Sequence, residues 1–365
     1  MFMQRHASIV ILIVAALFAT TMVITEAQSS QSQAQRSRVV GTRSSTPRES
    51  PTPPRQPSEP EAEVIRVETN LVNTLFTAVD KDHHFITTLR AEDVRIFESD
   101  VAQPVSLFER ETDRPLSLAI LVDTSASQMG VLPEEKRTAR VFIDSVLRPN
   151  VDRAAVVSFT GIPKVEQGLT NDLARLHKGI ERVKVELPPE VEETASEAEK
   201  HARDEDPRGY TSIWDATWMA IEDLLSKTPE GSRRAIILLT DGDDTRSTIK
   251  KQDVIDFALK SDVAIYSIGI RDRDFPEGKL DSDALRKVSD HTGGRAFFPA
   301  QPSELQAAFS QIDQELRSQY LIAYSPTNKN RDGTYRRIRV EVVNPELLKN
   351  KLRLLYREGY YAKKS

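Results

Sequence analysis

The sequence contains no cysteine among its 365 residues. Without cysteine the chain cannot form a disulfide, so its stability has to come from core packing and from any bound metal. The absence also excludes lipid attachment through an N-terminal cysteine. A chain of this length is expected to form one domain of roughly 200 residues with smaller flanking units.

A strong charge of either sign is also lacking. The formal net charge is −5, with 39% hydrophobic and 29% charged residues. This composition is ordinary for a soluble globular protein, and it predicts no nucleic-acid partner and no general attraction to acidic lipid. The long apolar run of the sequence is confined to its N-terminal segment, so we expect no stable membrane insertion once that segment is removed.

The N-terminal segment has the pattern of a secretory signal. Arg5 and His6 precede an apolar run over 9–24, and the small residues Thr25 and Ala27 suit cleavage after Ala27. The run is near the lower limit for crossing about 30 Å of hydrocarbon. We therefore expect residues 1–27 to be a cleaved signal peptide and the protein to be periplasmic or secreted. The alternative is an uncleaved N-terminal membrane anchor.

The next segment, 28–62, consists mainly of polar residues and proline. It cannot bury enough apolar surface to fold, so we expect a disordered linker. A period of two then appears over 63–112 and returns over 320–362, which predicts short strands. Each of these parts is too small to fold alone, so we expect them to pack together as one antiparallel β-sandwich-like unit. The expected strands are 72–78, 85–89, 93–98, 105–109, 320–324, 338–342 and 352–356.

Residues 113–319 follow a different pattern, in which continuous apolar runs alternate with amphipathic stretches. Runs of this kind suit strands that are buried on both faces of a parallel sheet. The pattern predicts a doubly wound, Rossmann-like α/β domain with a mostly parallel sheet. An acidic insertion over 186–209 interrupts the alternation, and we expect a solvated loop or a fraying helix there. The apolar runs are 118–122, 154–159, 235–239 and 263–270, and the helical stretches lie near 133–147, 171–184, 212–227, 250–261, 281–292 and 303–319.

Side chains that bear oxygen gather where these strands are expected to end. Asp123, Ser125 and Ser127 follow the first apolar run, Thr211 precedes a helix, and Asp241 follows the third run. Ligands of open α/β sheets bind at the carboxyl ends of strands. Because all five residues are hard oxygen donors, they suit Mg²⁺ or Mn²⁺ rather than zinc or copper. The sequence therefore predicts a metal site and no catalytic residue.

Three segments of the chain resemble the metal ion-dependent adhesion site (MIDAS) of von Willebrand factor type A (VWFA) domains. They are Asp-Thr-Ser-Ala-Ser at 123–127, Gly-Tyr-Thr at 209–211 and Thr-Asp-Gly at 240–242. The resemblance implies that Ser125 and Ser127 bind the metal directly, and that Asp123, Thr211 and Asp241 bind it directly or through water. It also implies an open position for an Asp or Glu carboxylate of a protein partner. The expected function is metal-dependent adhesion or assembly by an exported protein.

The flanking segments add to the resemblance. Residues 89–98, 319–326 and 359–361 are similar to the flanks of the VWFA-related proteins of Acidobacteria. That family usually has a glycine after the second Asp of a turn at which His83 and His84 stand here. This departure suggests a differently shaped loop.

The sequence leaves other functions as alternatives. The metal of a structural VWFA protein would only stabilise the fold. A phosphatase of the haloacid dehalogenase type needs a second Asp where Ser125 stands, and phosphoacceptor chemistry needs an acidic pair before Asp123. A serine hydrolase needs a histidine base, and the six histidines fall in the signal, a turn, the insertion and helix surfaces. The acidic run 204–206 lies before Thr211, where we favour mere solvation over an internal competitor for the metal.

Overall fold

The computed structural model describes residues 71–82, 84–110, 114–187, 196–272 and 279–364. All of them fall within one of the chain's two compact units, Arg66–Ser365. The expected signal peptide and linker lie outside the described residues. No helix among the described residues is both long enough and apolar enough to cross a membrane.

Six strands form the central sheet, in the order β10-β9-β8-β5-β6-β7. β5, β6, β8, β9 and β10 pair in parallel, and β7 pairs antiparallel to β6 at one edge. The expected doubly wound, mostly parallel sheet is therefore confirmed. The strands are β5 (Leu116–Asp123), β6 (Arg153–Phe159), β7 (Pro163–Thr170), β8 (Arg233–Thr240), β9 (Val263–Gly269) and β10 (Ala296–Phe297).

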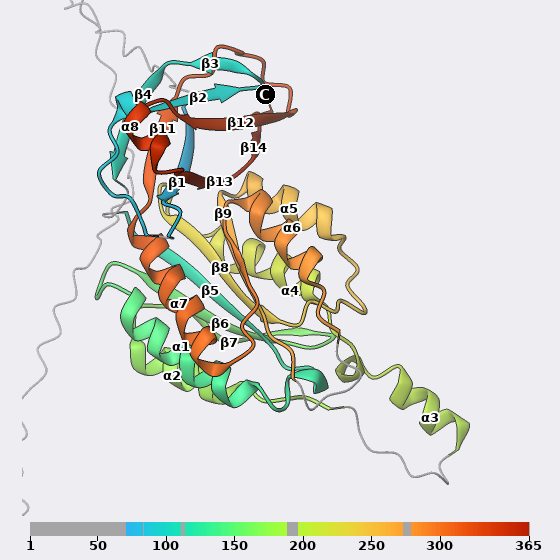
Figure 1. The fold of residues 1–365 in the computed structure, drawn as a ribbon. Helices are drawn as coiled ribbons and strands as arrows, with labels where there is room; N and C mark the ends of the chain where they lie inside the picture. Colours follow the sequence, from blue (N-terminus) through green and yellow to red (C-terminus); the bar gives the residue numbers. More distant parts are fainter. Residues whose placement is uncertain (1–70, 83, 111–113, 188–195, 273–278, 365) are drawn as a thin grey trace, which may run out of the picture. The chain divides into compact units, whose positions relative to one another are not determined.

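Helices cover both faces of this sheet. α1, α2 and α7 pack on one face, and α4, α5 and α6 pack on the other (Figure 1). β5 is buried along its whole length because its alternate residues point to opposite faces of the sheet. Leu118 and Ile120 belong to the core under α1, α2 and α7, and Ala119 and Leu121 belong to the core under α4, α5 and α6. The helices are α1 (Leu132–Val146), α2 (Leu173–Arg182), α4 (Ile213–Met219) continued by the π-helical η4 (Ala220–Leu225), α5 (Lys251–Lys260), α6 (Ser282–Thr292) and α7 (Pro302–Arg317).

The two outer segments of the described chain form a β-sandwich. Its sheets have the orders β13-β1-β11-β4 and β14-β12-β2-β3, so each sheet takes strands from both segments. Tyr320 of β11 pairs with Arg110 of β4, which places the entry to the α/β domain beside its exit. The predicted joint β unit is confirmed. Its strands are β1 (Val72–Val79), β2 (Val94–Glu98), β3 (Val101–Gln103), β4 (Val105–Arg110), β11 (Tyr320–Tyr324), β12 (Tyr335–Val342), β13 (Arg353–Tyr356) and β14 (Gly359–Tyr361), with the short helices η1 (Ala91–Asp93) and α8 (Pro345–Lys349).

A buried carboxylate lies at the centre of the sandwich. Glu98 accepts hydrogen bonds from the hydroxyls of Tyr324 (2.9 Å) and Tyr360 (2.8 Å) and pairs with Arg336 at 3.1 Å. Glu98 lies on β2, near the start of the described chain, whereas Tyr324 and Tyr360 lie on β11 and β14, near its end. Segments 89–98, 319–326 and 359–361 therefore meet in one polar network inside the sandwich.

One predicted strand is wrong. Residues 85–89 make only an isolated bridge, between Phe85 and Val79. The backbone amide of Leu89 donates to the hydroxyl of Tyr320, and that hydroxyl donates to the carbonyl of Ile86. A side chain thus satisfies backbone groups that a neighbouring strand would otherwise pair.

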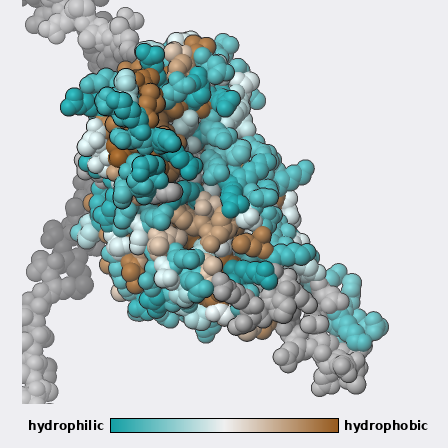
Figure 2. Space-filling view, viewed as in Figure 1, coloured by the Kyte–Doolittle hydropathy of each residue, from teal (hydrophilic) through white to brown (hydrophobic). Residues whose placement is uncertain are grey.

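The acidic insertion contains a short helix, α3 (Glu197–Asp204), followed by the 3-10 turn η3 (Pro207–Gly209). The described part of α3 projects from the domain and presents hydrophilic residues (Figures 1 and 2). Both ends of the insertion are tied to loops at the carboxyl edge of the sheet: the amide of Glu186 donates to Thr124 O at 3.0 Å, and that of Gly161 to Pro207 O at 3.1 Å. The insertion is thus anchored at both ends beside the predicted site.

Candidate metal centre

Asp123 is the last residue of β5 and is fully buried. Its Oδ1 accepts a hydrogen bond from the backbone amide of Ser125 at 2.9 Å, and its Oδ2 accepts one from the hydroxyl of Thr240 at 2.6 Å. Thr240 is the last residue of the neighbouring strand β8. The carboxylate is therefore held in one orientation by its own loop and by the adjacent strand.

A chain of side-chain hydrogen bonds continues from this loop to Asp241. The hydroxyls of Ser125 and Ser127 are 3.0 Å apart, and Ser127 Oγ donates to Asp241 Oδ2 at 2.6 Å. Gln128 Nε2 donates to the same carboxylate oxygen at 3.1 Å. The structure thus brings together four of the five residues that the sequence predicts for the site.

Thr211, the fifth predicted residue, joins this group through its backbone. Its amide donates to Thr245 Oγ1 at 2.8 Å, and its carbonyl accepts from the amides of Thr245 (2.9 Å) and Arg246 (3.1 Å). Thr245 belongs to the loop that begins at Asp241. The Thr211 loop is therefore fastened to the Asp241 loop, and the Thr211 side chain is buried.

The electrostatics of the site are unfavourable without a cation. Burial, and then the neighbouring charge of Asp241, raise the pKa of Asp123 to about 7. Burial is also the main cause that raises the pKa of Asp241. No basic side chain among the described residues forms an ion pair with either carboxylate. Two buried carboxylates that repel each other need positive charge between them, or they take up protons.

The donor set fits a divalent cation. Carboxylate and hydroxyl oxygens are the ligands that Mg²⁺ accepts, and Mg²⁺ keeps part of its water shell in protein sites. The side-chain oxygen of Gln128 and both carboxylate oxygens of Glu135 are buried without a hydrogen-bond partner. Unpaired buried acceptors beside two carboxylates are consistent with a hydrated cation, whose water molecules donate hydrogen bonds.

Sequence reasoning missed several residues around the site. Thr240 lies within the Thr-Asp-Gly segment but was not included among the donors. Asp272 follows β9 and accepts a 2.7 Å hydrogen bond from the amide of Gly130, which fixes the loop before α1. The rule that selected Asp241, an acid beyond the carboxyl end of a buried strand, also selects Asp272. Gln128 carried no signal in the sequence.

Each histidine of the described chain pairs with a carboxylate away from the two serines: His84 with Asp80, His177 with Asp144, His201 with Glu205 and His291 with Glu358. The hydroxyls of Ser125 and Ser127 bond to each other and to Asp241 instead. The arrangement therefore lacks, in this part of the chain, the serine–histidine contact of a hydrolase.

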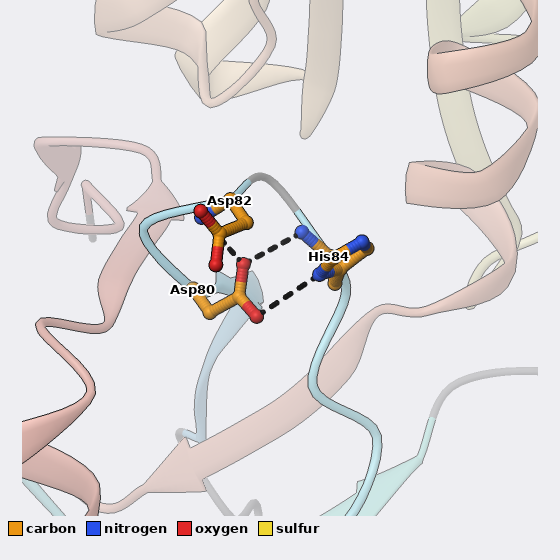
Figure 3. A group of neighbouring side chains, drawn as sticks. All are labelled: Asp80, Asp82 and His84. Carbon is orange, nitrogen blue, oxygen red and sulfur yellow. Dashed lines mark hydrogen bonds and ion pairs between the residues drawn. The ribbon is translucent and has the colours of Figure 1, made fainter.

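A second group of potential metal ligands lies in the turn after β1, where its side chains bond to the backbone of the turn. Asp80, Asp82 and His84 each place a ligand atom within 4.8 Å of the others (Figure 3). Asp80 Oδ1 accepts hydrogen bonds from the amides of Asp82 and His84, both at 2.8 Å, and its Oδ2 lies 3.2 Å from His84 Nδ1. Asp80 thus closes the turn after β1 through hydrogen bonds to the backbone.

The acidic run before Thr211 has partners of its own. Glu205 lies 3.3 Å from His201, and Asp206 pairs with Arg208 at 2.7 Å and also accepts its backbone amide. The side chain of Asp204 lies outside the described residues. Partners within the insertion favour solvation over competition for the site.

Comparisons with known proteins agree with the fold. The von Willebrand factor type A domain model matches residues 117–311. Inter-alpha-trypsin inhibitor heavy chain H4 of Bos taurus is 32% identical over 137 residues, which are 36% of this chain and 13% of that protein. The chain thus spans only about an eighth of the length of this relative.

Two solved structures have a similar fold at low identity. Proximal thread matrix protein 1 from the mussel byssus, solved with a zinc-occupied MIDAS motif, is 17% identical with a TM-score of 0.45, over 60% of this chain and 50% of that one. A von Willebrand factor type A protein from Catenulispora acidiphila is 13% identical with a TM-score of 0.43, over 81% and 74%. Since the family match spans more than half of the 365 residues, this chain belongs to the von Willebrand factor type A domain family.

Proposed function

We propose that the chain is an exported, metal-dependent protein-binding module for adhesion or assembly, and not an enzyme. One Mg²⁺ or Mn²⁺ is held by Asp123, Ser125, Ser127, Thr211 and Asp241. The observation that carries the proposal is that two buried carboxylates, Asp123 and Asp241, are linked through the amide and hydroxyl of Ser125 and the hydroxyl of Ser127, without a basic partner among the described residues. Such a group is costly to bury unless a cation neutralises it.

The residues have different tasks in this proposal. Ser125 and Ser127 offer neutral oxygen donors, while Asp123 and Asp241 supply the negative charge. Thr240 and Gln128 orient the two carboxylates through their hydrogen bonds. When bound, the cation supplies a coordination position for an anionic oxygen, for which an Asp or Glu carboxylate on a partner protein is the natural ligand. The partner is thus a protein surface, not nucleic acid.

Cation titration tests the proposal directly. Calorimetry with MgCl₂ and with MnCl₂ should detect one site in the wild type and none in Asp123→Ala. Peptides that display Asp or Glu should then bind the wild type in Mg²⁺ and not in EDTA. Equal titration curves for both proteins would contradict the metal site. Cation binding without any carboxylate ligand would favour a metal that only stabilises the fold, and turnover of a phosphate ester or peptide that is lost in Asp123→Ala would favour an enzyme.

The remaining parts of the proposal concern the whole chain. We infer a cleaved signal over 1–27, a linker over 28–62 and an α/β domain over 113–319 between the two halves of the sandwich, 63–112 and 320–362. We also infer that the flanks are similar to those of the VWFA-related proteins of Acidobacteria; in this chain Glu98, Tyr324 and Tyr360 of these flanks share one network. Mass spectrometry of the exported protein should give an N-terminus at Gln28. Retention of residues 1–27 would favour the membrane anchor.

A further inference from the structure

α1 carries an acidic side chain in the core of the α/β domain. Glu135 lies in the first turn of the helix and is completely buried. Neither of its carboxylate oxygens has a hydrogen-bond partner. Its neighbour Glu134, in contrast, pairs with Arg137 at the surface.

The position of Glu135 on the helix is one that normally takes an apolar residue. Leu132, Ala139, Phe142 and Ile143 share its face of α1 and belong to the core against the central sheet. These residues are spaced as one stripe of a helix with 3.6 residues per turn. A carboxylate buried in such a stripe without a partner costs several kcal/mol, so its presence requires a compensating group.

The charges that act on Glu135 are those of the candidate metal centre. Burial raises the pKa of Glu135 well above its usual value, and the charges of Asp123 and Asp241 raise it further. Asp123 ends β5, Asp241 follows β8, and Glu135 lies in the first turn of the helix that follows the β5 loop. None of the three forms an ion pair with a basic side chain of the described residues.

We propose that Glu135 is a third carboxylate of the cation site, which accepts hydrogen bonds from the water molecules of the bound ion and sets the net charge of the loaded centre. This inference rests on the proposed cation site. With Asp123 and Asp241, Glu135 places three negative charges against two positive ones. The carboxylate thus strengthens cation binding and weakens the attraction of the loaded centre for an anionic ligand.

The replacement Glu135→Gln keeps the shape of the side chain and removes the charge. We expect its affinity for Mg²⁺ to fall about tenfold, as is usual when a group that bonds to a metal-bound ligand is lost. We also expect the cation-loaded variant to bind acidic peptides more tightly than the wild type. In EDTA at pH 7, its Tm should rise because glutamine removes the free-energy cost of burying a carboxyl group whose pKa is raised. A purely structural role for Glu135 would not move the two affinities in opposite directions.

Two further variants make the test decisive. Glu134→Gln is the control on the same turn and should leave the affinity for Mg²⁺ unchanged. If Glu135→Gln does not fold, Glu135→Leu matches the apolar stripe and should likewise lose affinity for Mg²⁺ while gaining heat stability in EDTA. A variant at 135 with the affinity of the wild type would overturn the inference and leave the proposed function intact. A wild type that binds no cation would overturn both.

Discussion

The hydroxyl of Thr240 donates a 2.6 Å hydrogen bond to Oδ2 of Asp123, from the end of one parallel strand to the end of its neighbour. The contact is completely buried. It fixes the orientation of the central carboxylate before any ligand binds, because the sheet itself sets the spacing of β5 and β8.

Replacing Thr240 with Val should therefore damage the site more than the fold. The shape is kept, but Asp123 loses a buried hydrogen bond, which costs about 1–3 kcal/mol of stability. The affinity for Mg²⁺ should fall by about tenfold or more, measured by calorimetry. Thr240→Ser keeps the hydroxyl and should retain most of the affinity. Equal affinities in the Val and Ser variants would show that the contact does not orient the ligand.

Removal of the cation should lower the stability of the whole α/β domain. A ligand that binds only the folded state at about 100 times its Kd adds about 2.7 kcal/mol. The Tm of the wild type should therefore rise with MgCl₂ and return to its starting value with EDTA. Asp241→Asn removes one of the two negative charges at the site, so the rise of its Tm with MgCl₂ should be much smaller. A Tm that is independent of MgCl₂ in the wild type would contradict a cation site.

The pattern of the sequence was sufficient to predict most of the architecture. β5, β6, β8 and β9 were recognisable because burial on both faces requires continuous apolar runs. The edge strand β7 (Pro163–Thr170) escaped because it is mostly half-buried and carries the polar residues Lys164, Glu166 and Gln167, so it has no continuous apolar run. Residues 85–89 were misassigned because a tyrosine hydroxyl, distant in sequence, satisfies their backbone. Pairing partners of that kind leave no local signal.

The candidate site was only partly accessible from the sequence. Asp123, Ser125, Ser127 and Asp241 were found because strand ends converge at one edge of a parallel sheet. The sequence pattern shows Glu135 as a charged residue on the apolar stripe of α1, but the long side chains of many charged residues in such positions extend to solvent. Only the structure shows that both oxygens of this residue are buried without a partner. The contact of Gln128 with Asp241 depends on the shape of the loop and has no sequence pattern.

Arg336 should be essential for the stability of the β-sandwich. Its guanidinium pairs with the buried Glu98 and donates to Asn328 O at 2.7 Å. Arg336→Met leaves the Glu98 charge buried without its cation, which costs about 3–5 kcal/mol. Urea titration of both proteins should measure this decrease in the free energy of unfolding. Arg337 on the same strand is exposed, so Arg337→Met should cost less than about 0.5 kcal/mol. Similar losses in both variants would contradict a specific role of the buried pair.

The acidic insertion should not compete for the cation. The triple replacement Asp204→Asn, Glu205→Gln and Asp206→Asn should leave the affinity for Mg²⁺ and for acidic peptides unchanged, since Glu205 and Asp206 have partners within the insertion. Thr211→Ala serves as the comparison and should weaken the binding of Mg²⁺ and of acidic peptides. Tighter peptide binding by the triple variant would instead favour an acidic side chain that occupies the open position.

Glu315 should make the stability of the α/β domain depend on pH. This residue of α7 is buried, and burial raises its pKa from 4.5 to about 7, despite the opposing effects of Arg295 and Tyr266. Because the folded state holds the proton more tightly than the unfolded state, the stabilising contribution of this proton is fully present below pH 4.5. It is lost as the pH rises through about 7.

The replacement Glu315→Gln tests this dependence. Glutamine keeps an acceptor for the hydroxyl of Tyr266, which now lies 3.0 Å from Glu315 Oε1, and it has no charge to bury. The variant should gain about 3 kcal/mol over the wild type at pH 8 and almost nothing at pH 4.5. Urea titrations at both pH values, in EDTA to keep the cation site from contributing, measure the difference. A constant gap between the two proteins would mean that Glu315 does not titrate in this range, and that Arg295, at 3.7 Å, keeps it ionised.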